Sequence, residues 1–240
     1  MAADFPPDSR IDPKESIHYW SALPPTVNSM LGGYPQISRT DLRGSAAFYA
    51  KLLRQHPSSS PSQAPSQTVA VDCGAGIGRV TAGFLSNVAD VVDLLEPVAA
   101  FAAEARKVTM EGRGTVGEVF VKGLENWTPE PGRYDLIWNQ WCTLYLTDDQ
   151  FVAYLERCKA AIRRPDGWIV VKENSVKDGA GSVDIYDEDD SSVTRSEGKF
   201  LEIFNRAGLD VVAKEVQKGF PKGLGLYPVR MFALRPRQDT

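Results

Sequence analysis

Apolar residues along this chain alternate between two patterns. Short continuous runs, which are typical of buried strands, are separated by longer stretches in which apolar residues recur every three or four positions, as on one face of a helix. The runs predict strands at 69–72, 91–95, 117–121, 134–138, 168–173, 209–216 and 227–235. The helical stretches lie at 78–87, 98–111, 148–163 and 196–207. Because strand and helix alternate, the pattern predicts an α/β fold.

The chain before the first predicted strand has a different character. Residues 1–15 are polar and proline-rich, and we expect them to be disordered. Residues 16–55 carry aromatic and apolar residues at helical spacing, which predicts a helical cap that covers the sheet edge, acts as a substrate lid, or does both. Residues 56–68 are rich in Ser and Pro and predict a flexible linker. We therefore expect a single domain over 16–240 whose core spans 69–240.

A glycine-rich loop follows the first predicted strand. Gly74, Gly76 and Gly78 follow Asp72 and Cys73, and a helical stretch comes after them. Glycine lets a backbone approach a ligand closely because it has no Cβ, and the start of a helix offers free N–H groups. The second strand ends in Glu96, where a carboxylate commonly accepts the hydroxyls of a ribose. These features predict a nucleoside-cofactor site.

The spacing of the loop bears on which cofactor it binds. The dinucleotide fingerprint is G-x-G-x-x-G, whereas this loop has G-x-G-x-G with Asp72 before it. A carboxylate there is unfavourable for a pyrophosphate but compatible with the ammonium and sulfonium of S-adenosylmethionine. The loop resembles motif I of the class I S-adenosylmethionine-dependent methyltransferases. A nicotinamide or flavin site is the alternative that the loop alone leaves open.

Composition excludes several other classes of protein. The chain has 27 Lys and Arg against 31 Asp and Glu, so its net charge is −4 and it has no general basic surface for nucleic acid. No apolar run approaches the ~20 residues of a membrane span, and the N-terminus lacks the pattern of a signal peptide. The three cysteines have no C-x-x-C spacing and the two histidines are isolated. We therefore expect no metal site, no disulfide framework and no membrane, and an intracellular, reducing compartment.

Polar and aromatic residues follow the fourth and fifth predicted strands, at the edge where ligands bind in open α/β sheets. Those that would lie near the reactive end of the cofactor are Asn139, Gln140, Trp141 and Tyr145. Trp138 is better interpreted as a core residue, and Asn174 ends the fifth strand. Four consecutive acids follow at 187–190. Such a run is either a solvated loop or, beside an active site, a pocket for a cationic substrate.

A set of further motifs extends over about 16 to 236, nearly the whole chain. They are His18–Trp20, Pro24–Tyr34, Asp72–Arg79, Thr128–Pro131, Trp138–Trp141, Leu146–Asp148, Lys172–Asn174, Asp187–Ser192 and Phe232–Arg235. Together they resemble the protein α-N-terminal methyltransferases. The resemblance implies a seven-stranded, Rossmann-like class I sheet with an N-terminal helical cap and an inserted substrate-binding hairpin. It also implies transfer of methyl groups from S-adenosylmethionine, leaving S-adenosylhomocysteine, to the α-amino group of proteins that begin X-Pro-Lys or X-Pro-Arg after removal of Met.

The resemblance assigns roles to individual residues. Those implied to bind the cofactor are Gly74, Gly76, Arg79, Glu96, Leu124, Glu125 and Gln140. Those implied to bind the substrate are Trp20, Leu31, Ile37, Trp141, Asp187, Ser192 and Tyr227. Those implied to act in catalysis are Asp190, Asn174 and Tyr145. In this assignment Arg79 meets the methionine carboxylate, Trp141 packs against the second-position proline, and Asp187, Asp190 and Ser192 form the pocket for the third-position cation.

One position departs from the family pattern. Animal members have a histidine that accepts a proton where this chain has Tyr145. Because a tyrosine has a reference pKa near ~10, it is protonated at neutral pH and is a poor base. Proton acceptance is therefore expected to fall on Asp190, with Tyr145 orienting the amine or a water.

Two other functional classes share parts of the pattern. A methyltransferase for a small metabolite also needs a lid and a glycine loop, and a non-catalytic binding subunit can retain the cofactor fold. The aromatic and acidic residues together favour the protein methyltransferase. We expect a cytoplasmic protein that can also enter the nucleus, since no cluster of Lys and Arg for nuclear import is visible but the chain is small at 26.4 kDa. The sequence does not specify an oligomeric state.

Overall fold

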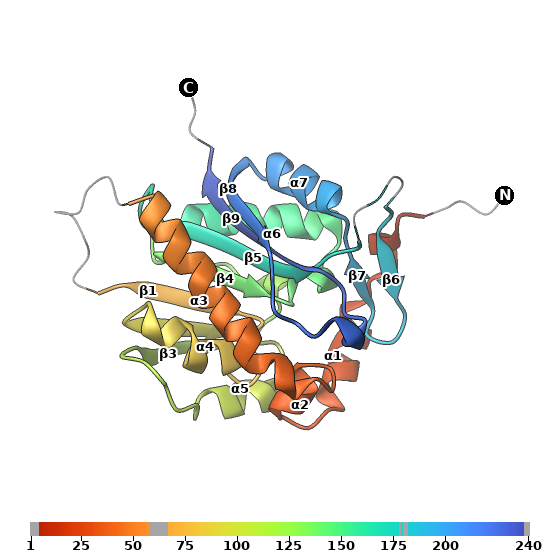
Figure 1. The fold of residues 1–240 in the computed structure, drawn as a ribbon, viewed down its shortest axis with the longest axis horizontal. Coiled ribbons are helices and arrows are strands. Elements are labelled where there is room, and N and C mark those ends of the chain that lie inside the picture. The colour runs from red at the N-terminus through yellow and green to blue at the C-terminus, as the bar shows by residue number, and fades with distance from the viewer. Residues whose placement is uncertain (1–4, 58–66, 178, 180–181, 238–240) are drawn as a thin grey trace.

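The chain folds around a seven-stranded sheet in the computed structural model, which describes residues 5–57, 67–177, 179 and 182–237 (Figure 1). The strands lie in the order β3-β2-β1-β4-β5-β9-β8. They are β1 (Val69–Cys73), β2 (Val91–Leu95), β3 (Thr115–Phe120), β4 (Leu136–Gln140), β5 (Trp168–Asn174), β8 (Leu209–Val216) and β9 (Val229–Pro236). Neighbours among β1 to β5 are parallel, whereas β9 is antiparallel to both β5 and β8. The predicted α/β fold with seven strands is confirmed.

Helices cover both faces of this sheet (Figure 1). The helices are α1 (Pro13–Ser21), α2 (Val27–Met30), α3 (Ser38–Gln55), α4 (Arg79–Gly83), α5 (Ala99–Ala105), α6 (Asp148–Ala161) and α7 (Glu197–Arg206). On one face Ala70 belongs to the same apolar cluster as Phe48 of α3, and on the other Val71 belongs to that of Phe151 of α6. Since successive side chains of a strand point to opposite faces, β1 is buried on both sides, as in other parallel sheets.

Two predicted helices are shorter in the structure than the apolar pattern suggests. The stretch 98–111 is helical only to Ala105, because the chain beyond it leaves the helix to bond elsewhere. Glu111 N donates to Ala82 O at 3.2 Å, and Gly114 N donates to Ser86 O at 2.8 Å. The stretch 78–87 is interrupted at Phe84, after which a short 3-10 helix covers Leu85–Asn87. Both differences arise from tertiary hydrogen bonds or backbone angles that periodicity does not report.

The N-terminal segment differs from the disorder that we expected over 1–15. A 3-10 helix covers Pro7–Arg10, and α1 begins at Pro13 with the Asp12 side chain accepting from Lys14 N. Asp8 Oδ2 accepts from Asp148 N at 2.9 Å, and Asp12 N donates to Ser191 Oγ at 2.8 Å. These contacts join positions that are far apart in the sequence, so composition gave no sign of them. Residues 1–4 and most of the predicted linker 56–68 lie outside the described residues.

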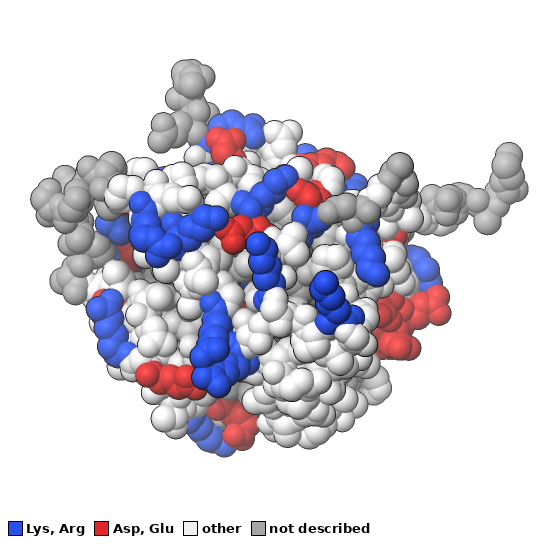
Figure 2. Space-filling view, viewed as in Figure 1, with Lys and Arg blue, Asp and Glu red and all other residues white. Residues whose placement is uncertain are grey.

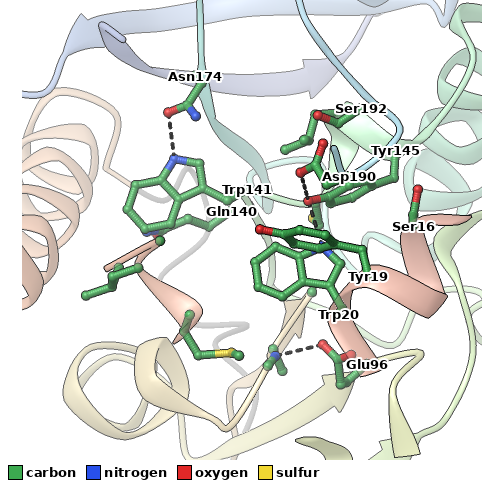
Figure 3. A pocket seen from close by; sticks show the side chains of 18 of the residues that line it. Ser16, Tyr19, Trp20, Glu96, Gln140, Trp141, Tyr145, Asn174, Asp190 and Ser192 are labelled. Carbon is green, nitrogen blue, oxygen red and sulfur yellow. Dashed lines mark hydrogen bonds between the residues drawn. The ribbon is translucent and has the colours of Figure 1, made fainter. Parts of the chain in front are cut away.

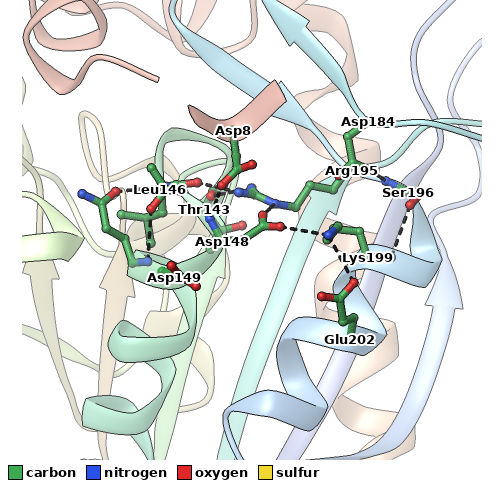
Figure 4. A network of polar contacts seen from close by, with 12 residues as sticks. Asp8, Thr143, Leu146, Asp148, Asp149, Asp184, Arg195, Ser196, Lys199 and Glu202 are labelled. Atoms are coloured by element: carbon green, nitrogen blue, oxygen red, sulfur yellow. Dashed lines mark hydrogen bonds and ion pairs between the residues drawn. The ribbon is translucent and has the colours of Figure 1, made fainter. Parts of the chain in front are cut away.

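A two-stranded hairpin is inserted between β5 and α7. It consists of β6 (Ile185–Asp187) and β7 (Ser192–Thr194), and it lies beside α1 (Figure 1). Arg195, which is fully buried, holds its base (Figure 4). The guanidinium donates to the carbonyls of Thr143 at 3.1 Å and Leu146 at 2.5 Å, and to Asp148 Oδ1 at 2.9 Å. The hairpin is thereby fixed against the segment that follows β4.

None of the helices in the part of the chain that the structure describes combines the length and apolar character that a membrane span needs.

Candidate active site

A cavity of about 510 Å³ opens at the carboxyl ends of β1, β2, β4 and β5. Its wall is completed by residues of α1 and α2, by the β6–β7 hairpin, and by the segment before β9 (Figure 3). The residues to which the sequence assigned cofactor-binding, substrate-binding or catalytic roles line this cavity. Asn139, also expected near the cofactor, is instead buried in the core, where it donates to Val170 O and accepts from Tyr154 Oη. The volume lies in the range of small-molecule and cofactor sites. The cavity is therefore one continuous site with room for both a cofactor and part of a second ligand.

The glycine loop forms the floor of the cavity beside β2. Gly74 and Gly76 have φ angles of 70° and 55°, which L side chains rarely adopt. A Cβ at Gly76 would lie 2.6 Å from Met30 Sδ, and one at Gly74 would lie 2.4 Å from Cys142 Cβ. The backbone angles favour glycine at both positions, and at Gly74 the nearby Cys142 Cβ also leaves no room for a side chain. The open backbone of the loop fits the close approach of a methionine moiety.

Glu96 lies at the end of β2 with its carboxylate held by the backbone. Oε2 accepts from Gly76 N at 2.8 Å, and Oε1 accepts from Val98 N at 2.8 Å (Figure 3). Burial raises the pKa of Glu96 to about 7, against the opposing effect of these two N–H groups. Each oxygen keeps a second acceptor position, because a carboxylate offers about four. The side chain is thus placed to accept two hydroxyls of a ribose.

Leu124 and Glu125 form a short 3-10 helix after β3 on the same side of the cavity. Arg157 of α6 holds this segment in place. Its guanidinium donates to Leu124 O at 2.8 Å, to Glu125 O at 3.2 Å and to Trp127 O at 2.8 Å. These residues therefore have a fixed backbone where the family resemblance places the adenine.

Arg79 and Gln140 line the cavity but also bind a residue that the sequence analysis missed. Asp41, in α3, is fully buried and lies 2.8 Å from Arg79 Nη2 and 2.5 Å from Lys172 Nζ. Gln140 Nε2 donates to both Asp41 oxygens at 2.9 and 3.0 Å. Although burial alone would raise the pKa of Asp41, Lys172 and Arg79 hold it below its usual value. Asp41 lies on the buried face of α3 together with Phe48 and Leu52. A carboxylate on this mainly apolar face is the one feature of the sequence that could have indicated a buried acid.

The opposite end of the cavity contains a hydrogen-bonded chain of three side chains. Trp20 Nε1 donates to Tyr145 Oη at 2.8 Å, and Tyr145 Oη donates to Asp190 Oδ2 at 2.8 Å (Figure 3). Burial, followed by the charge of Asp190, raises the pKa of Tyr145 well above its ordinary value, so the phenol stays protonated and acts as a donor. Asp190 Oδ1 is buried and has no hydrogen-bond partner among the described residues.

Burial also raises the pKa of Asp190 above its ordinary value, although the Ser192 and Tyr145 side chains oppose this effect. A half-buried carboxylate whose Oδ1 has an unused acceptor is suited to bind an ammonium group and to accept a proton from it. Tyr145, expected to orient the amine or a water, instead donates to Asp190 in this structure.

Trp141 lines the cavity directly after the end of β4. Its φ angle is 53°, an uncommon value for a bulky residue, and Trp141 N donates to Lys172 O at 3.1 Å. The indole Nε1 donates to Asn174 Oδ1 at 3.1 Å, which fixes the plane of the ring (Figure 3). Among the described residues the Asn174 side chain forms this hydrogen bond through its oxygen, and its amide N–H groups have no protein acceptor. The strained backbone therefore presents an oriented aromatic surface to the cavity.

The remaining predicted substrate residues surround Trp141 and Asp190. Leu31 and Ile37 are buried at the ends of α2 and of the 3-10 helix Pro35–Ile37, and Trp20 projects from α1. Asp187 is exposed at the turn of the hairpin, where its Oδ1 accepts from Asp189 N at 2.9 Å, and Ser192 is buried. Tyr227 is 42% exposed at the mouth. The cavity thus has an acidic end and an apolar lid.

Comparison with known proteins agrees with this geometry. Residues 8–235 match the family described as "AdoMet dependent proline di-methyltransferase". The chain belongs to this family. It is 44% identical over 227 residues to "Alpha N-terminal protein methyltransferase 1" of Schizosaccharomyces pombe, covering 94% of this chain and 96% of that protein. It is 41% identical over 218 residues to "N-terminal Xaa-Pro-Lys N-methyltransferase 1-B" of Xenopus laevis, covering 91% and 92%.

A solved structure supports the same conclusion. The fold matches that of a SAM-dependent methyltransferase from Leishmania major with a TM-score of 0.79 at 35% identity, covering 92% of this chain and 82% of that one. As a member of the family, the chain is an S-adenosylmethionine-dependent protein N-terminal methyltransferase, and the predicted cofactor and reaction class are confirmed.

The geometry at Glu96 leads to the first prediction. Glu96→Ala removes two acceptors for ribose and should weaken binding of S-adenosylhomocysteine by about 2–4 kcal/mol. Because the pKa of Glu96 is raised to about 7, we also expect affinity in the unmodified protein to rise from pH 6 to pH 8 as the carboxylate ionises. Calorimetric titration at several pH values checks both. Glu104→Ala, an exposed acid of α5, is the control, and unchanged affinity in Glu96→Ala would refute the ribose assignment.

Proposed function

We propose that this methyltransferase acts on the α-amino group of proteins that begin X-Pro-Lys or X-Pro-Arg once the initiator Met has been removed. The observation that carries the proposal is the free, buried acceptor of Asp190 at the acidic end of a cavity whose wall is Trp141. Relatives named as Xaa-Pro-Lys methyltransferases at about 40% identity support the same substrate class.

Each part of such a terminus meets a matching part of the site. A proline ring is rigid, apolar and without an N–H, so it can pack on the indole of Trp141 without leaving a donor unpaired. The side-chain amide of Asn174 would bind a carbonyl of the peptide, while its Oδ1 holds the indole. The cation at position three would form charge-assisted hydrogen bonds with Asp187, beside Ser192.

Bound S-adenosylmethionine supplies a methyl group on a sulfonium. The residues of this chain position and neutralise the amine. An α-amino group has a pKa near ~8, so a substantial fraction is already neutral at pH 7 and a modest base is sufficient. Asp190 holds the ammonium and takes its proton, and Tyr145 keeps the carboxylate oriented through the 2.8 Å hydrogen bond. Trp20 in turn fixes Tyr145, so closure of the lid and alignment of the base are linked.

The direct test is methyl transfer to a short X-Pro-Lys peptide with isotopically labelled cofactor. The matched control is the same peptide with an acetylated α-amine, which keeps the lysine but blocks the proposed acceptor. Transfer to both peptides, or to neither, would contradict the proposal. A small-molecule N-methyltransferase is the alternative reading of the fold, and it predicts no transfer to either peptide.

A second prediction concerns the proline. Replacing it with alanine should cost much of kcat/KM, and Trp141→Ala should cost less with the alanine peptide than with the proline peptide. The expected coupling energy is about 1 kcal/mol, the size of an aromatic ring contact beyond simple burial. A double-mutant cycle from initial rates measures it. Additive effects would mean that Trp141 does not contact the proline.

We also propose that the protein works in the cytoplasm, the nucleus or both. The three cysteines are free thiols, which suits a reducing compartment. Fractionation of cells that express the tagged chain tests this proposal, and recovery in a secreted fraction would contradict it.

A further inference from the structure

The mouth of the cavity has sides of opposite charge. The β6–β7 hairpin contributes Asp187, Glu188 and Asp189, all exposed. Among the residues that the structure describes, Glu188 alone of these three forms an ion pair, with Arg10. The facing side is formed by the segments 31–43 and 217–227, whose one acidic residue is the fully buried Asp41. An electric field therefore runs across the mouth.

Four exposed cations mark the facing side, which we name the basic rim. They are Arg39, Arg43, Lys218 and Lys222. Within the described residues none of them forms an ion pair, unlike Lys51 and Lys214 further along the same face, which pair with Glu215 and Glu197. Figure 2 shows basic side chains spread over the face that α3 presents, and acidic ones gathered at the edge that the hairpin occupies.

The two parts of the basic rim lie together at the cavity. Gln217 Nε2 donates to Thr40 O at 3.3 Å, and a Cβ at Gly219 would lie 3.0 Å from Thr40 Cγ2. The segment after β8 therefore lies on the first turn of α3. Ile37, Phe220 and Leu224 line the cavity, and each rim cation at 39, 218 and 222 is two residues from one of them.

We propose that the basic rim binds an acidic segment of the protein substrate, a few residues beyond its methylated terminus. This inference rests on the proposed function, since it takes the terminus to lie in the cavity. The cation at position three binds the acidic side of the mouth, and the chain that follows leaves over the basic side. A substrate whose sequence changes from basic to acidic after its first residues would match both sides.

The length of the basic rim indicates which residues of the substrate would reach it. From Ile37 to Arg43 the helix rises roughly 9 Å, a length that about three residues of extended chain cover. Acids at about positions 6 to 10 of the substrate would then face the rim. The interaction is between exposed charges, so it acts mainly on encounter and KM and weakens as salt is added.

A nucleic acid is a less suitable occupant. The rim has four cations in a chain of net charge −4, and the acidic hairpin across the mouth would repel a phosphate backbone. The basic rim also adjoins residues of the cavity wall. A peptide that leaves the cavity would therefore pass over the rim.

The experiment compares two peptides of about 14 residues, long enough to pass the mouth when extended. Both begin X-Pro-Lys, and one carries Asp and Glu where the other carries Asn and Gln at about positions 6 to 10. We expect the acidic peptide to have a KM about 5- to 20-fold lower at low salt, with kcat unchanged. The double variant Lys218→Glu, Lys222→Glu should abolish this preference, and 0.5 M salt should reduce it, on the scale set by screening.

The matched control is Arg54→Glu, an exposed cation at the distant end of α3, which should keep the preference. The neutral peptide should be methylated equally well by the double variant. Equal KM for both peptides in the unmodified protein would overturn the inference, as would a loss for both peptides in the double variant. Binding of a DNA duplex that requires Lys218 and Lys222, without a peptide preference, would also overturn it.

Labelled peptides in a fluorescence anisotropy titration separate this inference from the proposed function. If neither peptide is methylated, the proposed function fails. The anisotropy titration still tests the inference, because it measures the affinity of each peptide without methyl transfer. Equal affinities for the unmodified protein would mean that the basic rim does not bind acidic residues of the substrate.

Discussion

Asp190→Asn should lower kcat about 10²-fold or more, with a smaller change in KM. Asparagine keeps the shape of the side chain but has no charge and no useful basicity, so the amine must reach the site already neutral. Tyr145→Phe should cost less, because it removes the phenol that orients Asp190 through Oδ2 but leaves the carboxylate itself. Steady-state rates on an X-Pro-Lys peptide measure both losses.

The pH dependence of Asp190→Asn separates a base from a binding residue. As the pH rises toward the α-amine pKa of ~8, solvent supplies more neutral amine, and the variant should regain part of its kcat. The same rise should help the unmodified protein less. A variant that changes only KM and gains nothing at high pH would show that Asp190 binds the ammonium without taking its proton. Greater damage from Tyr145→Phe would also contradict the assignment.

Asp41→Asn should lower the free energy of unfolding by about 3–5 kcal/mol, the cost of breaking a buried ion pair from one side. The variant leaves Lys172 Nζ, which is fully buried, and the nearly buried Arg79 without their carboxylate. Urea unfolding followed by circular dichroism measures the loss. The double variant Asp41→Asn, Lys172→Met is the control, since removing the unpaired ammonium should restore part of the stability.

The direction of the Asp41 shift also sets the pH at which this contribution disappears. The folded-state pKa is held below the ordinary value, so the stabilisation is present above the unfolded pKa of ~3.9 and is lost as the pH falls through the lower, folded value. The unmodified protein should therefore lose stability in acid more steeply than Asp41→Asn. Parallel curves for the two proteins below pH 4 would mean that Asp41 is not charged in the folded state.

The sequence predicted the sheet well because each strand carries its own apolar run. The five strands from β1 to β5 are each found within about two residues of their predicted starts, and Trp138, interpreted as core, is fully buried. The helix α6 begins at its predicted position, where Thr147 and Gln150 form a capping box. These features depend on neighbouring residues, and local patterns therefore report them.

The features that the sequence did not predict depend on long-range contacts. Asp41 and Lys172 are 131 positions apart in the sequence. Because a local pattern covers only neighbouring residues, it cannot predict that a buried acid in α3 pairs with a lysine in β5. Likewise, Asp12 is ordered through Ser191, although its own segment is proline-rich and polar. The replacement of histidine by Tyr145 was visible in the sequence, but its hydrogen bonds with Trp20 and Asp190 are seen only in the structure.

The anchoring of the hairpin bears on how substrate preference can diverge within this fold. Arg195 donates to the main-chain oxygens of Thr143 and Leu146 and to the carboxylate of Asp148. Two of these three acceptors are carbonyl groups of the backbone, which do not depend on the side chains at those positions. The turn between β6 and β7 is held separately by the N-terminal segment, where Asp12 N donates to Ser191 Oγ and Arg10 pairs with Glu188. Redesign of Asp187, Glu188 and Asp189 can change which third residue is accepted while Arg195 and Asp190 keep the frame and the chemistry. Substrate preference can therefore change through the hairpin turn without altering the cofactor site or the catalytic residues.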